Sequence, residues 1–528
     1  MVLVLTAASL AATVGRGPAS TDTRNSGTFR VAFPAFSSSF DPALSYSVEG
    51  WTVLSATCAR LMTNPDKPLP DGFRVVPEVA AAAPKPTKGG RAWTFRLRSG
   101  FRFSDGAPVR ASAFEQAIYR TLAPGIESAG AQYTGAIVGA GAVQRGETSD
   151  VAGVTATGLV LTVRFTHPVP DFPAQTTMPF FCAVPPNLPS DPEGVSKFPS
   201  AGPYYVSDYR AGQRAVLDRN RYYGGKRPHH VDRFVIDLDA SSGNEVLDRI
   251  ERGSVEWGTA GPPDFTDPER RLVAKYGINR SQFFVKPSLS LRAFMLNTSR
   301  GIFRNNARLR QAVNLAVDRA AMQRATTGRV GSSLTDQYLP SSMPGFRDAD
   351  IYPLKRPNLR KARSYAKGHT RSGKAVLYTF NDPRPLALAQ IVRQNLASIG
   401  IDVTVKAFAF NAYFKHVKKE HYDLAFDPWT ADYPDPYSLV NLLLERQFIG
   451  GSNLSRFNSP KYNRLLQRAA RLQGSARYRA YGNLDVRLAR DAAPILAIDV
   501  FNETTLVSKR VGCVVLRPTL DLAAVCLK

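Results

Sequence analysis

The stretch WTFRLRSGFRFSDG, from Trp93 to Gly106, is the part of the sequence that is most specific for a fold. Its first residues alternate with period two, so that Trp93, Phe95 and Leu97 face one way and the polar residues between them face the other. Such alternation is typical of a half-buried β-strand. We expect a hairpin that turns at Ser99-Gly100.

Further strands and helices are indicated on both sides of this stretch. GTFRVAF, residues 27–33, indicates a first strand, and a second lies within residues 158–172, where prolines end it. An apolar helix over residues 389–399 ends at Gly400, and the strand IDVTV follows at once. Helices that alternate with strands in this way predict an α/β fold.

The length and composition indicate a globular protein of several domains. Single cores stop growing near about 250 to 300 residues, so 528 residues predict two or three domains. Hydrophobic residues make up 44%, aromatic residues 10% and charged residues 21%, which excludes a disordered, collagenous or coiled-coil chain.

The amino-terminal residues predict export. MVLVLTAASLAATVG, residues 1–15, is apolar, rich in small residues and shorter than the roughly 20 residues that span a bilayer. We therefore expect residues 1–26 to be a signal peptide and linker. Thr13 stands where a lipoprotein would carry its lipidated cysteine, and no later apolar run is long enough for a membrane helix.

Four cysteines, Cys58, Cys182, Cys513 and Cys526, permit two disulfides with three possible connectivities in an oxidising compartment. Proximity in the sequence favours Cys513 with Cys526. No CxxC spacing occurs, so we expect disulfides and no metal site.

The local signatures of several enzyme classes are absent. The sequence contains no HExxH, no GxSxG and no GxxxxGK[ST], and it has six histidines. Carboxylates are abundant, but no segment singles out a catalytic pair. The sequence therefore favours a protein that is not an enzyme and carries no cofactor.

One segment combines rigid aromatic and acidic side chains. YDLAFDPWTADYPDP, residues 422–436, combines Trp429 and Tyr433 with Asp427, Asp432 and Asp435 and with three prolines, directly after an apolar strand. Aromatic rings can stack on a ligand and a carboxylate can bind an amine, so the segment is a candidate recognition loop. An ordinary proline-rich turn with half-buried aromatics would have the same composition.

Several of these pieces, taken in order along nearly the whole chain, resemble family 5 of the extracellular solute-binding proteins of ABC transporters, the oligopeptide-, dipeptide- and nickel-binding group. The matching pieces are GTFRVAF; PEVA followed by WTFRLRSGFRFSDGAPVRASAF; AGPYYV with RNRYYGG; LRAFMLNTS with RLRQAVNLAVDR; LASIGIDVTV; YDLAFDPWTADYPDP; and NLSRFNSPKYNRLLQRA. Each piece is weak alone, whereas their order and spacing are specific.

The resemblance implies a periplasmic-binding-protein-like α/β fold of class II, in the large cluster that carries an extra subdomain. Two lobes joined by a two-strand hinge would close over a ligand in the cleft between them. The expected division is 27–66 and 189–287 for lobe I, 67–188 for the extra subdomain inserted in it, 288–494 for lobe II, and 495–528 for the return to lobe I.

The resemblance also implies a set of ligand-binding residues. In the peptide-binding branch an aspartate in this motif receives the amino terminus of the peptide, and the matching residue is Asp432. Trp429 matches an aromatic residue beside it. The candidate ligand-binding residues are Asp432, Trp429, Tyr433, Phe40 and Asn297.

The leading hypothesis is a monomeric, exported protein, periplasmic or at the cell surface, that delivers a peptide or other small solute to an ABC permease. Nickel, haem and oligosaccharides stay open as ligands. A secreted hydrolase of cell-wall peptides is one alternative. Another is a surface protein that uses its net charge of +25 to bind anionic polymers, although no nucleic-acid-binding module is recognisable.

Overall fold

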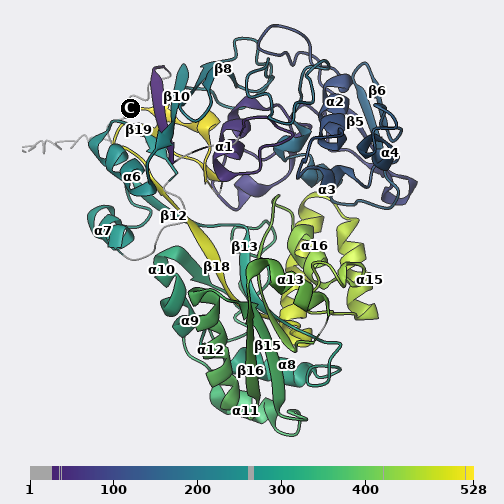
Figure 1. Cartoon of the computed structure of the whole chain (residues 1–528), viewed down its shortest axis with the longest axis vertical. Coiled ribbons are helices and arrows are strands. Elements are labelled where there is room, and N and C mark those ends of the chain that lie inside the picture. The colour runs from purple at the N-terminus through teal and green to yellow at the C-terminus, as the bar shows by residue number, and fades with distance from the viewer. Residues whose placement is uncertain (1–25, 35, 37–38, 260–266, 420, 518) are drawn as a thin grey trace, which may run out of the picture.

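The computed structural model describes residues 26–34, 36, 39–259, 267–419, 421–517 and 519–528. These residues form two lobes, one above the other in Figure 1. The predicted signal peptide and linker, residues 1–26, lie outside the described residues except for Ser26. Among the described residues, no helix is long and apolar enough to cross a membrane.

Lobe I, the upper body in Figure 1, is built on a five-stranded sheet in the order β11-β1-β10-β9-β8. Strand β1 runs parallel to β10 and β11, and the other neighbours are antiparallel. Phe29, Val31 and Phe33 of β1 are fully buried, as expected for a central strand. The strands are β1 (Thr28–Pro34), β8 (Tyr204–Arg210), β9 (Arg214–Arg219), β10 (Arg233–Ala240) and β11 (Trp257–Gly258).

The extra subdomain contains a four-stranded antiparallel sheet in the order β4-β5-β7-β6. The predicted alternation is confirmed, because Trp93, Phe95 and Leu97 are buried and Thr94 is exposed. The predicted hairpin at Ser99-Gly100 is wrong. The strands are β4 (Pro86–Thr87), β5 (Ala92–Arg96), β6 (Val154–Thr157) and β7 (Val160–Arg164).

The hairpin fails because strand β5 pairs with β7, which is more than sixty residues away in the sequence, and not with the residues after Gly100. The segment after the turn closes on itself instead. The amide of Phe103 donates to the carbonyl of Ala107, and the amide of Val109 donates to the carbonyl of Phe101. Local alternation thus predicted the strand but not its partner.

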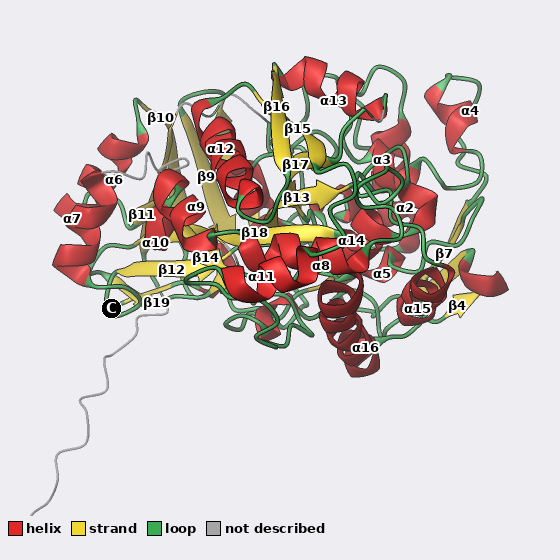
Figure 2. Cartoon of the chain, turned by 90° about the horizontal axis from the view of Figure 1, so that it is seen from below, coloured by secondary structure: helices red, strands yellow, loops and turns green. Residues whose placement is uncertain are grey.

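Lobe II, the lower body in Figure 1, is built on a seven-stranded mixed sheet in the order β12-β18-β13-β17-β15-β16, with β14 also paired to β18. Helices α8 (Ala307–Ala316), α9 (Arg319–Thr326) and α12 (Pro383–Ala397) lie beside its strands, and α11 (Leu359–Ala366) packs on α8 (Figure 2). The strands are β12 (Phe283–Pro287), β13 (Ser290–Leu296), β14 (Ser332–Leu334), β15 (Lys374–Phe380), β16 (Asp402–Phe408), β17 (Leu424–Thr430) and β18 (Ile495–Leu506).

We assign the helices to the three parts according to the domain division expected from the sequence. Those of lobe I are α1 (Val48–Thr57), α6 (Gly243–Arg252) and α7 (Asp267–Tyr276). Those of the extra subdomain are α2 (Ala111–Leu122), α3 (Ala131–Thr134), α4 (Ala140–Gln144) and α5 (Phe172–Gln175). Those of lobe II are α8 (Ala307–Ala316), α9 (Arg319–Thr326), α10 (Gly328–Gly331), α11 (Leu359–Ala366), α12 (Pro383–Ala397), α13 (Phe410–Lys418), α14 (Tyr437–Leu444), α15 (Pro460–Ala470) and α16 (Gly474–Arg487).

Strands β12 and β18 run between the two lobes (Figure 1). They pair antiparallel from Phe283↔Leu506 to Pro287↔Asn502. The earlier part of β18 pairs with β13 in lobe II, and Val507 just beyond it forms a bridge to Trp257 in lobe I. This two-strand connection is the expected hinge.

Both pairs of cysteines form disulfides. Cys513 is bonded to Cys526, the pair favoured by proximity, with Cα atoms 4.8 Å apart, and Cys58 is bonded to Cys182 with Cα atoms 5.3 Å apart. The second bond ties the end of α1 to the end of the extra subdomain, and none of the four cysteines is free.

We propose to keep the domain division expected from the sequence, with one refinement. The five-stranded sheet takes its strands from residues 28–34 and 204–258, and the four-stranded sheet from residues 86–164. Because the first residues of β18 pair within lobe II, we place the last crossing inside β18 and not before residue 495.

Candidate ligand-binding site

Two neighbouring pockets lie where the lobes face each other. The Asp432 pocket, about 200 Å³, is lined by residues of lobe I, the extra subdomain and the loop after β17. The hinge pocket, about 540 Å³, is lined by residues of both lobes and of β18. Val48, the first residue of α1, lines both pockets and is half-exposed, so the two pockets are parts of one cleft.

Asp432 lies at the meeting point of all three parts of the protein. One carboxylate oxygen accepts a hydrogen bond of 2.6 Å from the hydroxyl of Tyr46 in lobe I, and the other accepts one from the hydroxyl of Tyr133 in α3. Burial, followed by the effect of Asp432, raises the pKa of both tyrosines above their usual range. Both phenols therefore stay protonated and act as donors that orient the carboxylate.

Aromatic rings surround this carboxylate. The Tyr46 ring lies 5.6 Å from that of Trp51 and 6.0 Å from that of Phe180, and the Tyr133 ring lies 6.1 Å from both Phe180 and Tyr433. Electron-rich ring faces next to a carboxylate form a favourable environment for an ammonium group. The arrangement fits a cationic end of a ligand.

Buried contacts of its neighbours Asp435 and Tyr433 hold the loop that carries Asp432. Asp435 is buried and accepts two hydrogen bonds, of 2.8 and 2.6 Å, from the guanidinium of Arg477 in α16. Tyr433 is also buried, and its hydroxyl donates to Asp171 of the extra subdomain. The neighbours of Asp432 in the sequence are thus structural, and they fix where Asp432 projects.

The hinge pocket is larger and more apolar. Its walls include the rings of Trp257, Phe380, Phe426 and Phe501, together with aliphatic and hydroxyl-bearing residues from both lobes. Arg292 lines it as well, but its Nε donates to Asp499 at 2.7 Å within a buried ion pair. This end of the cleft offers mainly apolar surface to a ligand.

The structure separates the five ligand-binding residues expected from the sequence. Asp432 lines the cleft, whereas Trp429, Tyr433, Phe40 and Asn297 are not among the lining residues of either pocket. Trp429 is half-buried, and its indole nitrogen donates to the carbonyl of Ser438 at 2.9 Å. Its neighbours on β17, Pro428 and Thr430, face the hinge pocket instead.

Phe40 and Asn297 have structural environments. Phe40 is 1% exposed in the core of lobe I and stacks on Phe36 at 4.9 Å. Asn297 is fully buried just after β13, where its side-chain amide donates to the carbonyl of Tyr422 and its oxygen accepts from Ser299. Strand β13 faces the hinge pocket at Ser290, which is the opposite end of that strand.

Three residues around Asp432 were not found from the sequence: Trp51, which lines the Asp432 pocket, and Tyr46 and Tyr133, whose hydroxyls donate to Asp432. They come from two segments about eighty residues apart, and both lie about 300 or more residues before Asp432. Neither segment has a spacing that marks a site. Tyr46 is half-exposed, which is unusual for an aromatic residue but cannot be read from one sequence.

The fold and the cleft together define the class: a two-lobed solute-binding protein. The chain belongs to the bacterial extracellular solute-binding proteins, family 5, whose model matches residues 74–450. Members of this family are binding proteins and not enzymes. Among the described residues, no cluster of three or more His, Cys, Asp or Glu could hold a metal ion.

The chain is similar to curated relatives over most of its length. It is 24% identical over 493 residues to the oligopeptide-binding protein OppA of Bacillus subtilis strain 168, which covers 88% of this chain and 86% of that protein. It is 26% identical over 498 residues to the probable D,D-dipeptide-binding periplasmic protein DdpA of Escherichia coli K12, which covers 91% and 90%.

Solved structures share the fold. The clavulanic acid biosynthesis oligopeptide binding protein 2 has a TM-score of 0.81 at 25% identity, with 96% of each chain covered. The periplasmic murein tripeptide binding protein MppA in its unliganded open form also has a TM-score of 0.81, at 21% identity, with 97% of this chain and 99% of that chain covered.

Proposed function

We propose that this protein is the exported, monomeric binding component of an ABC importer, and that it captures short peptides by closing its lobes and delivers them to the permease. The observation that carries the proposal is the position of the Asp432 carboxylate. Its carboxylate lies in the cleft between tyrosines of lobe I and the extra subdomain, and it would bind the peptide's free amino group.

The relatives support a peptide as the ligand. OppA, DdpA and MppA are named for oligopeptides, D,D-dipeptides and murein tripeptide. A peptide that starts at Asp432 would extend along the cleft toward the hinge pocket, where apolar walls accept varied side chains. No bond in the ligand is broken, because its differential affinity for the closed state drives the conformational change.

Peptides with free and blocked amino groups test this proposal. Trialanine and longer peptides should raise the melting temperature in a concentration-dependent way, with a gain of about 2.7 kcal/mol at 100 times the dissociation constant. X-ray scattering should show a smaller radius of gyration with the ligand. The same peptides N-acetylated should have much weaker effects.

Two results would contradict the proposal. The first is equal binding of acetylated and free peptides, which would remove the role of Asp432 as amine anchor. The second is a peptide library that changes neither melting nor scattering while a sugar, haem or nickel does.

A further inference from the structure

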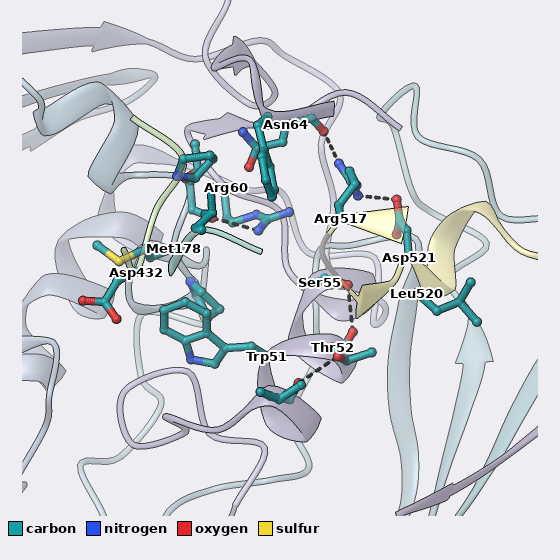
Figure 3. A pocket seen from close by; sticks show the side chains of 16 residues that line it. Trp51, Thr52, Ser55, Arg60, Asn64, Met178, Asp432, Arg517, Leu520 and Asp521 are labelled. Atoms are coloured by element: carbon teal, nitrogen blue, oxygen red, sulfur yellow. Dashed lines mark hydrogen bonds and ion pairs between the residues drawn. The ribbon is translucent and has the colours of Figure 1, made fainter. Parts of the chain in front are cut away.

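The Asp432 pocket has an apolar wall and a polar floor. Figure 3 shows the indole of Trp51 and the thioether of Met178 on one side. The guanidinium of Arg60 lies in the middle of the lining residues, and that of Arg517 lies between Asn64 and Asp521. At about 200 Å³, the pocket is smaller than typical small-molecule sites, so it suits one side chain better than a whole ligand.

Arg60 is held in place but keeps one donor unused. It is 7% exposed, and its two terminal nitrogens donate to the carbonyl of Thr177 at 2.8 Å and to the hydroxyl of Thr63 at 3.2 Å. Its Nε forms no hydrogen bond with any described residue, and the nearest carboxylate oxygen, of Glu78, is 3.8 Å away. A buried donor without an acceptor is costly, and a ligand that supplies the acceptor removes that cost.

Arg517, on the other side of the floor, also has one donor without an acceptor among the described residues. One terminal nitrogen donates to the carbonyl oxygens of Asn64 and Pro65, and the other reaches the carboxylates of Asp66 and Asp521. Its Nε is buried and likewise forms no hydrogen bond within the described residues.

The carboxylate that lines the floor, Asp521, is already used. Of the Asp521 oxygens, one accepts from Arg227 and the amide of Ala523, and the other accepts from Arg517. The Oε1 of Glu78 is also buried without a hydrogen bond to any described residue, but Glu78 does not line the pocket. Among Arg60, Arg517 and Asp521, which do line it, the unused groups are the two Nε donors, which favours a ligand group that accepts hydrogen bonds.

We propose that this pocket binds the side chain of the first ligand residue, and that it selects side chains that end in a carbonyl oxygen, namely glutamine and glutamate. This inference rests on the proposed function, because an amino group held by Asp432 at the pocket places the first side chain next to it. The aliphatic part of the side chain packs on Trp51 and Met178, and its oxygen accepts from Arg60 and Arg517.

Four tripeptides with free amino termini test the inference on the unmodified protein: Gln-Ala-Ala, Glu-Ala-Ala, Leu-Ala-Ala and Lys-Ala-Ala. Calorimetric titration should give dissociation constants about tenfold to a hundredfold lower for Gln and Glu than for Leu, because a hydrogen bond to a charged donor replaces an unsatisfied one. Lys should bind most weakly, since its ammonium would face two guanidinium groups.

The outcomes separate this inference from the proposed function. If all four tripeptides bind with affinities within about threefold, or if Leu binds more tightly than Gln, the selectivity is contradicted while peptide capture stands. If none of the four binds and trialanine does not bind either, the proposed function itself fails, and the inference fails with it.

Variants locate the selectivity in this pocket. Ser55 lines the pocket and is partly exposed, so Ser55→Leu should fold while it fills the space. It should remove the preference for Gln over Ala as first residue, whereas Ser55→Ala should keep the preference. Arg60→Lys should reduce the Gln-to-Leu preference at least several-fold, and an unchanged preference in both Ser55→Leu and Arg60→Lys would overturn the assignment.

Discussion

The two ends of the cleft differ in size and in the chemistry they offer. The Asp432 end is small and carries a carboxylate whose direction two tyrosine hydroxyls fix, above a floor of buried guanidinium groups. The hinge end has more than twice the volume, and aromatic rings make up much of its wall. The Asp432 end is suited to bind the amino-terminal group of a ligand, and the hinge end is suited to accept the varied side chains that follow it.

This difference explains how one cleft can be specific and permissive at once. Charge-assisted hydrogen bonds depend strongly on position, so under the proposed function we expect the Asp432 end to select a particular ligand group. Apolar contact is roughly proportional to buried area and has no direction, so the hinge end accepts many side chains.

The largest effect, on the free energy of unfolding, is expected at the ion pair between Asp435 and Arg477, which holds the loop that carries Asp432. Asp435→Ala leaves the Arg477 guanidinium buried without its carboxylate, and breaking such a pair typically costs about 3 to 5 kcal/mol. Chemical denaturation should show this loss in the free energy of unfolding. Glu147→Ala, which removes one partner of the exposed Arg145–Glu147 pair, should leave the unfolding curve unchanged, and equal curves for both variants would show that Asp435 does not support the loop.

A smaller, pH-dependent effect should appear at the floor of the same pocket. Burial raises the pKa of Asp66 to about 6, although Arg227 and Arg517 oppose the shift. Burial would also raise the pKa of the neighbouring Asp521, but Arg517 and Arg227 hold it at about 2. Between pH 7.5 and 5.5, Asp66 therefore takes up a proton while Asp521 stays ionised.

Protonation of Asp66 removes a negative charge beside the arginines, so the acidic pH should favour a glutamate side chain over a glutamine. The ratio of dissociation constants, Gln-Ala-Ala over Glu-Ala-Ala, should rise roughly two- to fivefold from pH 7.5 to 5.5. The ratio cancels the titration of the amino group that both peptides share. Asp66→Asn should abolish the change, and a ratio that falls with decreasing pH would contradict the sign.

The smallest effect is expected at the hinge end. Thr430 lines the hinge pocket and is exposed, so Thr430→Ala should change peptide affinity by no more than about twofold. Titration with one peptide of at least four residues, long enough to reach the hinge, checks this. A loss of tenfold or more would show that the hinge end also selects its ligand by specific contacts.

Much of the fold could be predicted from the sequence, since periodicity reports burial directly. The alternation from Trp93 to Leu97 is present in the structure, and the helix expected over residues 389–399 is present as α12, although it runs from Pro383 to Ala397. The hairpin at Ser99-Gly100 was wrong, because the partner of β5 is β7 and pairing across that distance leaves no local signal.

The site was predicted less well. Asp432, Asp435 and Tyr433 stand within four positions in one motif, yet one faces the cleft and two are buried in structural contacts. Composition cannot separate these roles. Which of the three side chains faces the ligand depends on Arg477 and Asp171, which lie on distant segments and come close only in the folded chain.

The most direct test of the account is calorimetric titration of Asp432→Asn with trialanine. The variant keeps the size of the side chain but removes the charge that meets the amino group, and loss of one partner of such a pair typically costs about 2 to 5 kcal/mol. Affinity should fall roughly 30-fold to a few thousandfold. Asp427→Asn on β17, which lines neither pocket of the cleft, is the matched control and should bind like the parent. If Asp432→Asn binds trialanine as tightly as the parent does, Asp432 is not the anchor and the account is wrong.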